Sequence, residues 1–178
     1  MIALARHGET PYNAQRRFQG HLPVPLTARG REQARELAEV AARQRWSSLW
    51  VSPLARAQET AAIVAERVGL EPRVDARFAE TDCGDWTDRF FDDVEAEDPE
   101  AFAAYARADP DFAFPGGESF AAQQRRVLDG LADVRRDGEL PALVICHRGS
   151  IRLALAGLHG DDALRSAEVP NGVLVEVP

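Results

Sequence analysis

Two unbroken apolar runs, Ile2–Ala5 and Ala142–Cys146, each lead directly into a short peptide that contains Arg, His and Gly. A run of this length that ends at a turn is typical of a strand buried on both faces of a sheet. A third apolar run predicts a strand over Trp46–Val51. We also expect a short strand over Arg73–Asp75 and a last strand over Gly172–Val177.

Between these strands, apolar residues recur at the spacing of an amphipathic helix. The spacing predicts helices over 28–45, 53–68, about 98–108, 119–136 and 150–157. Thr27 is a candidate N-cap for the first helix, and Ser52 followed by Pro53 is a candidate start for the second. Strands that alternate with helices predict an α/β fold, here a three-layer αβα sandwich with a mostly parallel central sheet.

Two segments lack this periodicity. Residues 11–26 are interrupted by Pro and Gly, and they form either a solvated polar loop or part of the pocket beyond the first strand. Residues 87–117 are the most acidic part of the chain. We expect 87–117 to leave the core and cover one side of that pocket, within a single domain over residues 1–178; a tolerated surface insertion is the alternative.

The composition narrows the classes of partner. The chain has 178 residues and a formal net charge of −8, and all 21 of its basic residues are Arg. The acidic balance argues against nucleic acid or an anionic membrane as the main partner, and the absence of Lys excludes a Schiff-base or P-loop lysine. No apolar stretch is long enough to span a bilayer, and the N-terminus lacks the pattern of a signal peptide.

Cys83 and Cys146 are too few and too far apart in the sequence for a disulfide framework or a zinc site. We therefore expect reduced thiols in a cytoplasmic protein, with neither a metal nor a cofactor.

The candidate chemistry lies at the ends of three predicted strands. Arg6 and His7 follow the first, Arg56 follows the second, and His147 and Arg148 follow the strand that ends at Cys146. Because ligands of open α/β sheets bind beyond the carboxyl ends of the strands, these side chains should converge on one edge of the sheet. Arg offers a planar fork for phosphate, and His is a nucleophile or proton carrier near neutral pH.

Each of these residues also has an ordinary structural interpretation. Arg6 and His7 could form an incidental surface turn, and Arg56 could be a surface cation. A cation in the first turn of a helix is poorly placed electrostatically, which favours a functional role for Arg56. Gly8 is expected to let the backbone approach a ligand closely. The recurrence of His beside Arg and Gly at two strand ends favours a site over coincidence.

Several segments occur in a recognisable order over nearly the whole chain. They are Leu4–Thr10, Asn13 with Arg17–Gly20, Pro25–Thr27, Ser52–Ala61, Glu80 with Gly84 and Trp86, Pro115–Ser119, and Cys146–His147. This set resembles the histidine phosphatase superfamily, the phosphoglycerate mutase-like proteins, and within it the compact phosphatase branch.

The resemblance implies a phosphoric monoester hydrolase of the histidine acid phosphatase type that acts without a metal. In such an enzyme His7 would attack phosphorus and become a phosphohistidine, and Glu80 would serve as general acid and then base. Arg6, Arg56 and His147 would hold the phosphoryl oxygens. Further substrate contacts are expected from Asn13, Gln19, Gly20 and Arg148. The expected partner is a small phosphorylated metabolite, and the chain is expected to be a monomer or a homodimer.

Some alternatives stay open at this point. The residues alone do not separate Glu80 from its acidic neighbours Asp82 and Asp85. Arg148 occupies a position where Gly is common in the family; it could add a cation at the phosphate, bind a distal acid of the substrate, or pair with a nearby acid of the protein. A cofactor-dependent phosphoglycerate mutase and a non-catalytic phosphate-binding protein are the competing functions.

Overall fold

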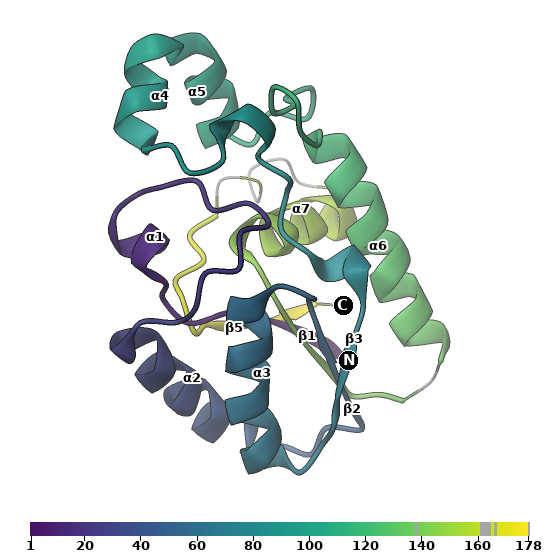
Figure 1. Ribbon diagram of the computed structural model, residues 1–178. Coiled ribbons are helices and arrows are strands. Elements are labelled where there is room, and N and C mark those ends of the chain that lie inside the picture. The colour runs from purple at the N-terminus through teal and green to yellow at the C-terminus, as the bar shows by residue number, and fades with distance from the viewer. Residues whose placement is uncertain (138, 161–164, 166, 178) are drawn as a thin grey trace.

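The computed structural model describes residues 1–137, 139–160, 165 and 167–177, and it has a central five-stranded sheet in the order β3-β2-β4-β1-β5 (Figure 1). The strands are β1 (Ile2–Arg6), β2 (Ser48–Val51), β3 (Pro72–Val74), β4 (Ala142–Cys146) and β5 (Leu174–Val177). Neighbouring strands pair in parallel, except that β5 runs antiparallel to β1. The sheet is therefore mostly parallel, as predicted.

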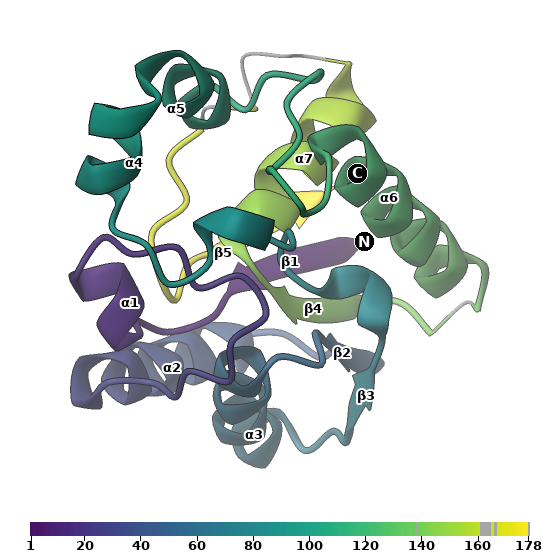
Figure 2. The ribbon, with the colours of Figure 1, turned by 45° about the horizontal axis from the view of Figure 1, so that its top comes forward.

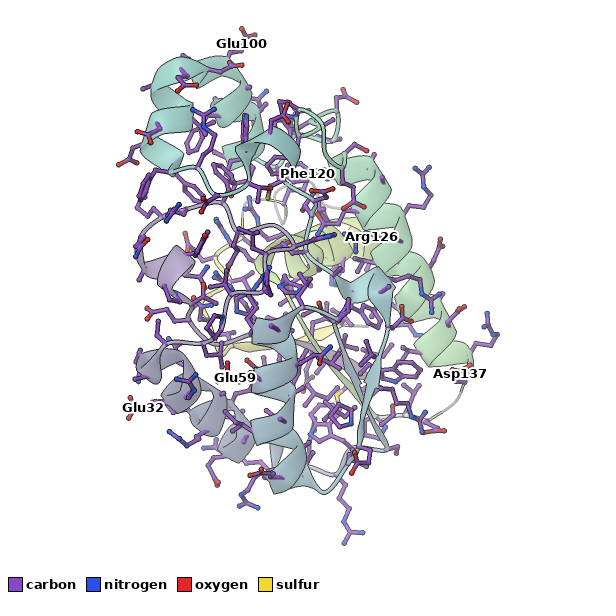
Figure 3. All side chains as sticks on the ribbon, in the orientation of Figure 1. Glu32, Glu59, Glu100, Phe120, Arg126 and Asp137 are labelled. Carbon is purple, nitrogen blue, oxygen red and sulfur yellow. The ribbon has the colours of Figure 1, made fainter. Side chains whose placement is uncertain are left out.

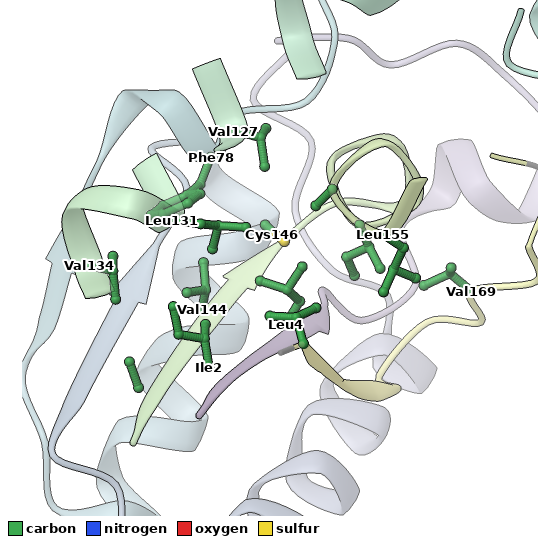
Figure 4. Packing of buried hydrophobic residues seen from close by; sticks show 14 residues of the cluster. Ile2, Leu4, Phe78, Val127, Leu131, Val134, Val144, Cys146, Leu155 and Val169 are labelled. Atoms are coloured by element: carbon green, nitrogen blue, oxygen red, sulfur yellow. The ribbon is translucent and has the colours of Figure 1, made fainter. Parts of the chain in front are cut away.

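Helices cover both faces of this sheet, which confirms the three-layer αβα arrangement (Figures 1 and 2). One face carries α2 (Ala28–Ala41) and α3 (Ala55–Val68), and the other carries α6 (Phe120–Arg136) and α7 (Arg148–His159). Successive side chains of a strand point to opposite faces, so Ile2 and Leu4 join one hydrophobic core while Ala3 and Ala5 join the other. Figure 4 shows the first core, where Ile2 and Leu4 lie in one cluster with Val144 and Leu131.

Of the two predicted helix starts, one is confirmed and the other is wrong. Thr27 caps α2 by accepting a hydrogen bond from the Gly30 backbone N–H, as predicted. The prediction for Ser52 was wrong, because α3 begins two residues later than Pro53, at Ala55, with no side-chain cap. The Ser52 hydroxyl instead accepts from the Leu54 N–H and lies 2.7 Å from His147 Nε2. The strand prediction at Trp46 was also too long, since β2 begins at Ser48.

The two aperiodic segments contain short helices that hydrophobic spacing did not reveal. Within 11–26, α1 (Pro11–Ala14) is held by a capping box between Thr10 and Asn13. Within 87–117, α4 (Phe91–Glu97) precedes α5 (Pro99–Ala106), which is shorter than the helix predicted over 98–108 and is capped by Asp98. The last helix was also underestimated, since α7 extends from Arg148 to His159 and ends at Gly160 in the left-handed conformation.

The segment around α4 and α5 has an apolar cluster of its own, and Figure 1 places both helices away from the sheet, beyond α1. The cluster is rich in aromatic side chains, among them Phe18, Trp86, Phe112, Phe114 and Phe120. Figure 3 shows Phe120 within the body of the molecule, whereas Glu32, Glu100 and Asp137 extend from its periphery. This aromatic cluster lies next to the pocket described below.

Candidate active site

His7 lies directly beyond β1 and is 2% exposed. Its backbone N–H donates to the Cys146 carbonyl (3.1 Å), which continues the β1–β4 pairing and brings the His7 and His147 rings to 5.1 Å between centroids. His7 Nδ1 lies 2.7 Å from the Gly8 carbonyl oxygen. A carbonyl oxygen only accepts, so Nδ1 carries the hydrogen and Nε2 keeps its lone pair. His7 is thus oriented as a nucleophile through Nε2.

Burial and nearby cations keep both histidines unprotonated. Complete burial lowers the pKa of His7 well below 6.5, and the guanidinium groups of Arg56 and Arg6 lower it further. Burial and Arg56 likewise lower the pKa of His147 well below 6.5. At neutral pH each ring is therefore a neutral imidazole, the form that can attack an electrophile or accept a proton.

Arg56 is fully buried, which rules out the surface interpretation of this residue. Its Nε donates to His7 Nε2 (3.3 Å), and its Nη2 donates to the Gly20 carbonyl (2.9 Å). No ion pair joins it to a carboxylate within the part of the chain that the structure describes. Burial lowers the pKa of Arg56 to about 10, so the group is still charged at neutral pH. A buried cation held only by neutral groups is costly unless an anion joins it.

Two buried nitrogen atoms beside His7 lack a hydrogen-bond partner among the described residues: Arg6 Nε and His147 Nδ1. Arg6 is otherwise fixed by a 2.5 Å hydrogen bond from Nη1 to the Val169 carbonyl. His147 is fixed through Nε2 and Ser52. Buried polar nitrogen atoms without partners are rare in folded proteins, and here both lie near a histidine that is oriented for attack. An anion with several oxygen atoms would accept a hydrogen bond from Arg6 Nε, and it would accept one from His147 Nδ1 in the tautomer in which the Ser52 hydroxyl donates to Nε2.

The Glu80 carboxylate is held by several donors at the start of α7. Its Oε2 accepts from the Gly149 N–H (3.2 Å), and its Oε1 accepts from the Thr81 N–H (3.0 Å) and from Gln123 Nε2 (2.9 Å). A Cβ atom at Gly149 would lie 2.4 Å from Glu80 Oε1, so a side chain at this position would displace the carboxylate. The carboxylate is thereby fixed at the wall of the pocket that also contains His7.

The backbone that carries Glu80 is tied to α6 by Arg126. The guanidinium donates to the carbonyl oxygens of Arg77, Ala79 and Glu80, and it forms an ion pair with Glu118 (2.7 Å). Figure 3 shows Arg126 on the side of α6 that faces this segment. Neither Asp82 nor Asp85 lines the pocket, and both are exposed, so Glu80 is the acid of this segment that the pocket contains.

The remaining predicted binding residues gather at the same pocket. Asn13, Gln19, Gly20 and Arg148 line it together with Arg6, His7 and Glu80, whereas Arg56 and His147 lie behind His7. Residues of 87–117 supply part of the apolar wall: Phe91, Tyr105, Ala108 and Phe114. Asn13 is also engaged with Thr10, and Gln19 accepts from the Thr10 hydroxyl (2.9 Å).

The structure shows a packing role for Gly8. A Cβ atom at Gly8 would lie 2.2 Å from the Gly30 carbonyl oxygen, so Gly8 permits close packing against the start of α2.

Sequence reasoning missed Gln123, Arg126 and Asn171, whose amide donates to the His7 carbonyl (2.9 Å). A signal existed only for Gln123, a polar residue on the otherwise apolar inward face of α6.

The two neutral histidines predict a loss of stability in mild acid. The unfolded chain keeps a histidine pKa of about 6.5, so below that pH the unfolded state binds protons that folded His7 and His147 do not. Stability is therefore full above pH ~6.5 and declines as the pH falls toward the folded pKa values, by about 1.4 kcal/mol per pH unit for each histidine. Urea unfolding at about pH 7.5, 6.5 and 5.5 measures this slope.

The variant His147→Gln should lose half of this pH dependence, and His159→Gln, at an exposed position in the last turn of α7, should keep all of it. An unchanged slope in His147→Gln would contradict the assignment of a neutral buried ring.

Within the described residues, no group of three or more His, Cys, Asp or Glu side chains is arranged to hold a metal ion. In the same part of the chain, each helix is too short or too polar to cross a membrane. Cys83 and Cys146 are both free and buried, and burial raises the pKa of each thiol.

The chain is similar to known proteins over most of its length. The family model for the histidine phosphatase superfamily (branch 1) matches residues 2–177. A probable phosphoglycerate mutase of Enterobacter sp. (strain 638) is 37% identical over 145 residues, which cover 80% of this chain and 67% of that protein. Phosphoserine phosphatase 1 of Hydrogenobacter thermophilus is 33% identical over 162 residues, which cover 90% of this chain and 77% of that protein.

Among solved structures, a mycobacterial glucosyl-3-phosphoglycerate phosphatase in complex with VO3 superposes with a TM-score of 0.89 and 31% identity, covering 97% of this chain and 90% of that one. The named relatives thus include phosphatases as well as a probable mutase. On the family match over residues 2–177 and these relatives, the chain belongs to the histidine phosphatase superfamily.

Proposed function

We propose that this protein is a metal-independent phosphomonoesterase that hydrolyses a small phosphorylated metabolite through a phosphohistidine on His7. The observation that carries the proposal is the pair of unpartnered buried nitrogen atoms, Arg6 Nε and His147 Nδ1, beside a histidine whose lone pair is on Nε2 and accepts only a long hydrogen bond from Arg56. A phosphoryl group brings the oxygen atoms that these nitrogen atoms lack as partners. The named phosphatases among the relatives support the same reaction class.

In the first step, Nε2 of neutral His7 attacks phosphorus while the bond from phosphorus to the ester oxygen breaks. The hydrogen bond from Arg56 Nε to His7 Nε2 is long, at 3.3 Å, and it is given up as phosphorus approaches. Arg6, Arg56 and His147 then stabilise the charge on the equatorial oxygens, which is the main catalytic demand of phosphoryl transfer. Glu80, in its protonated form, gives its proton to the departing oxygen and becomes the carboxylate that the second step uses.

In the second step, water attacks the phosphorus of the phosphohistidine. The Glu80 carboxylate accepts a proton from this water, and the bond between phosphorus and Nε2 breaks. Inorganic phosphate leaves, and His7 is again a neutral imidazole with its proton on Nδ1. The Gly8 carbonyl holds that proton throughout, which keeps the ring in one orientation for both steps.

The direct test is hydrolysis of p-nitrophenyl phosphate by protein treated with excess EDTA. We expect turnover to be unchanged by the chelator, because the charge-stabilising groups are all guanidinium and imidazole side chains of the chain itself. Loss of turnover on chelation that is restored by added metal would contradict metal independence. Absence of any turnover, combined with interconversion of phosphoglycerates in the presence of a bisphosphate primer, would replace the phosphatase with a mutase.

A further inference from the structure

Arg148 is a cation that lines the pocket but has no role in the proposed chemistry. It is the first residue of α7, is half-buried, and lines both the pocket with His7 and a neighbouring hollow. Its guanidinium has neither a hydrogen bond nor an ion pair with any residue that the structure describes. The pairing with a nearby acid that the sequence left open is therefore not found, although the exposed Glu168 lines the neighbouring hollow.

Arg152 lies one helical turn further along α7, so it shares a face with Arg148 and also lines the pocket. Arg152 is 5% exposed, and its guanidinium is fixed by hydrogen bonds to the carbonyl oxygens of Arg165 and Ala106. Burial first, and then the charge of Arg148, lowers the pKa of Arg152 to about 10, so both groups are cations at neutral pH and repel each other. Arg152 thus places a fixed positive charge next to the less constrained charge of Arg148.

The charges around the pocket do not balance within the described part of the chain. Arg6, Arg148 and Arg152 line it, Arg56 lies against His7 behind it, and Glu80 is the carboxylate among the lining residues. Arg17 also lines it but is paired with Asp88 at 2.5 Å. Four guanidinium groups and one carboxylate leave three positive charges in excess, so a phosphoryl dianion would compensate two of them and leave at least one uncompensated. A cation at the start of a helix is also poorly placed against the helix dipole, so Arg148 carries a local cost that a bound anion would offset.

We propose that Arg148, supported by Arg152, binds a carboxylate on the same substrate whose phosphoryl group faces His7. This inference rests on the proposed phosphatase function and narrows its substrate class to small phosphomonoesters that carry a carboxylate. A carboxylate supplies the single negative charge that the phosphoryl group leaves unmatched, and its two oxygens fit the guanidinium fork. The aromatic wall formed by Tyr105, Phe114 and Phe120 lies along the same pocket.

The test compares two esters that differ only in the carboxylate: 3-phosphoglycerate and glycerol 3-phosphate. Their equilibrium binding is measured by calorimetry on a His7→Ala background, which prevents turnover, so the result does not depend on whether the protein is a phosphatase. We expect 3-phosphoglycerate to bind at least about tenfold more tightly, the usual effect of one charge-assisted contact. Adding Arg148→Gln should abolish this preference, and Arg148→Lys, which keeps the charge but loses the fork, should retain part of it.

The matched control is Arg29→Gln, which removes the same charge from an exposed position on α2 where Arg29 pairs with Glu32 and Glu36. It should leave the preference intact. O-phosphoserine and phosphoethanolamine form a second pair that differs in the same way, and they should follow the same pattern. Equal binding of the two esters, binding of neither at millimolar concentration, or a preference that survives Arg148→Gln would overturn the carboxylate subsite.

Failure of the proposed function would appear in a separate measurement, the turnover of p-nitrophenyl phosphate. The wild-type protein would then not hydrolyse p-nitrophenyl phosphate, which lacks a carboxylate and does not report on Arg148 selectivity. Turnover of this ester without a carboxylate preference would reject the subsite and retain the phosphatase. A carboxylate preference in binding without turnover would retain the subsite and reject the phosphatase.

Discussion

Replacement of His7 by Ala is expected to lower kcat for p-nitrophenyl phosphate by roughly 10⁴-fold or more, because it removes the nucleophile of the covalent step. The neighbouring donors Arg6, Arg56 and His147 stay in place, so phosphate binding should persist while turnover is lost. In the wild type, quenching the reaction in base during turnover should trap phosphate on His7, because phosphohistidine is stable in base. Quenching in acid should lose this phosphate, because phosphohistidine is not stable in acid.

The matched control is His159→Ala, at an exposed position at the end of α7. It should turn over p-nitrophenyl phosphate at the wild-type rate. Circular dichroism and urea unfolding establish that His7→Ala is folded before its rate is interpreted. Wild-type turnover in a folded His7→Ala protein would remove the phosphohistidine from the mechanism.

Replacement of Glu80 by Gln is expected to affect substrates according to their leaving group. Hydrolysis of an alkyl phosphate, whose leaving oxygen must be protonated, should slow by about 10²–10⁴-fold. Hydrolysis of p-nitrophenyl phosphate should slow much less in its first step, because p-nitrophenolate departs without a proton. The amide keeps the size of the carboxyl group, and its oxygen can still accept from the Gly149 N–H. The readout is the ratio of kcat/KM values for the two esters, because kcat/KM reports only the steps up to the phosphohistidine and not its hydrolysis, in which Glu80 acts as base for both.

Asp82→Asn provides the comparison, because Asp82 is an exposed acid two residues away whose side chain only accepts from the Gly84 N–H. It should leave the ratio at its wild-type value. An equal loss on both esters in Glu80→Gln would show that Glu80 holds the site together without transferring a proton. A change of ratio in Asp82→Asn would transfer the acid role to this neighbour.

The arrangement of the sheet was predictable because the sequence patterns that specify each strand are local. The runs Ile2–Ala5 in β1 and Ala142–Cys146 in β4 are apolar at every position, and short runs of this kind are typical of strands covered on both faces. The alternation of strands and helices then leaves few topologies for the layers. The same logic brings Arg6, His7, Arg56 and His147 to one edge of the sheet, since each follows a strand of that sheet.

The short helices α1 and α4 were not predictable in this way. α1 depends on a capping box between Thr10 and Asn13, and α4 packs Phe91 and Val94 into a cluster that forms only when distant segments meet. The prediction of where α3 starts was wrong for a related reason. Ser52 had the right type and spacing for an N-cap, but its hydroxyl is engaged with His147 from a strand more than ninety residues away in sequence.

The sequence alone determined which residues could take part in phosphate chemistry and at which edge of the sheet they lie. Only the tertiary structure decided the protonation, burial and orientation of these residues. The Nδ1 proton of His7 is assigned by the Gly8 carbonyl, the charge of Arg56 is buried by Gly20 and its surroundings, and Glu80 is positioned by Gln123 and Gly149. The contact between His7 and Gly8 is local, but those of Arg56 and Glu80 join segments far apart in the chain, and hydrogen-bond direction and burial exist only once those segments are packed together.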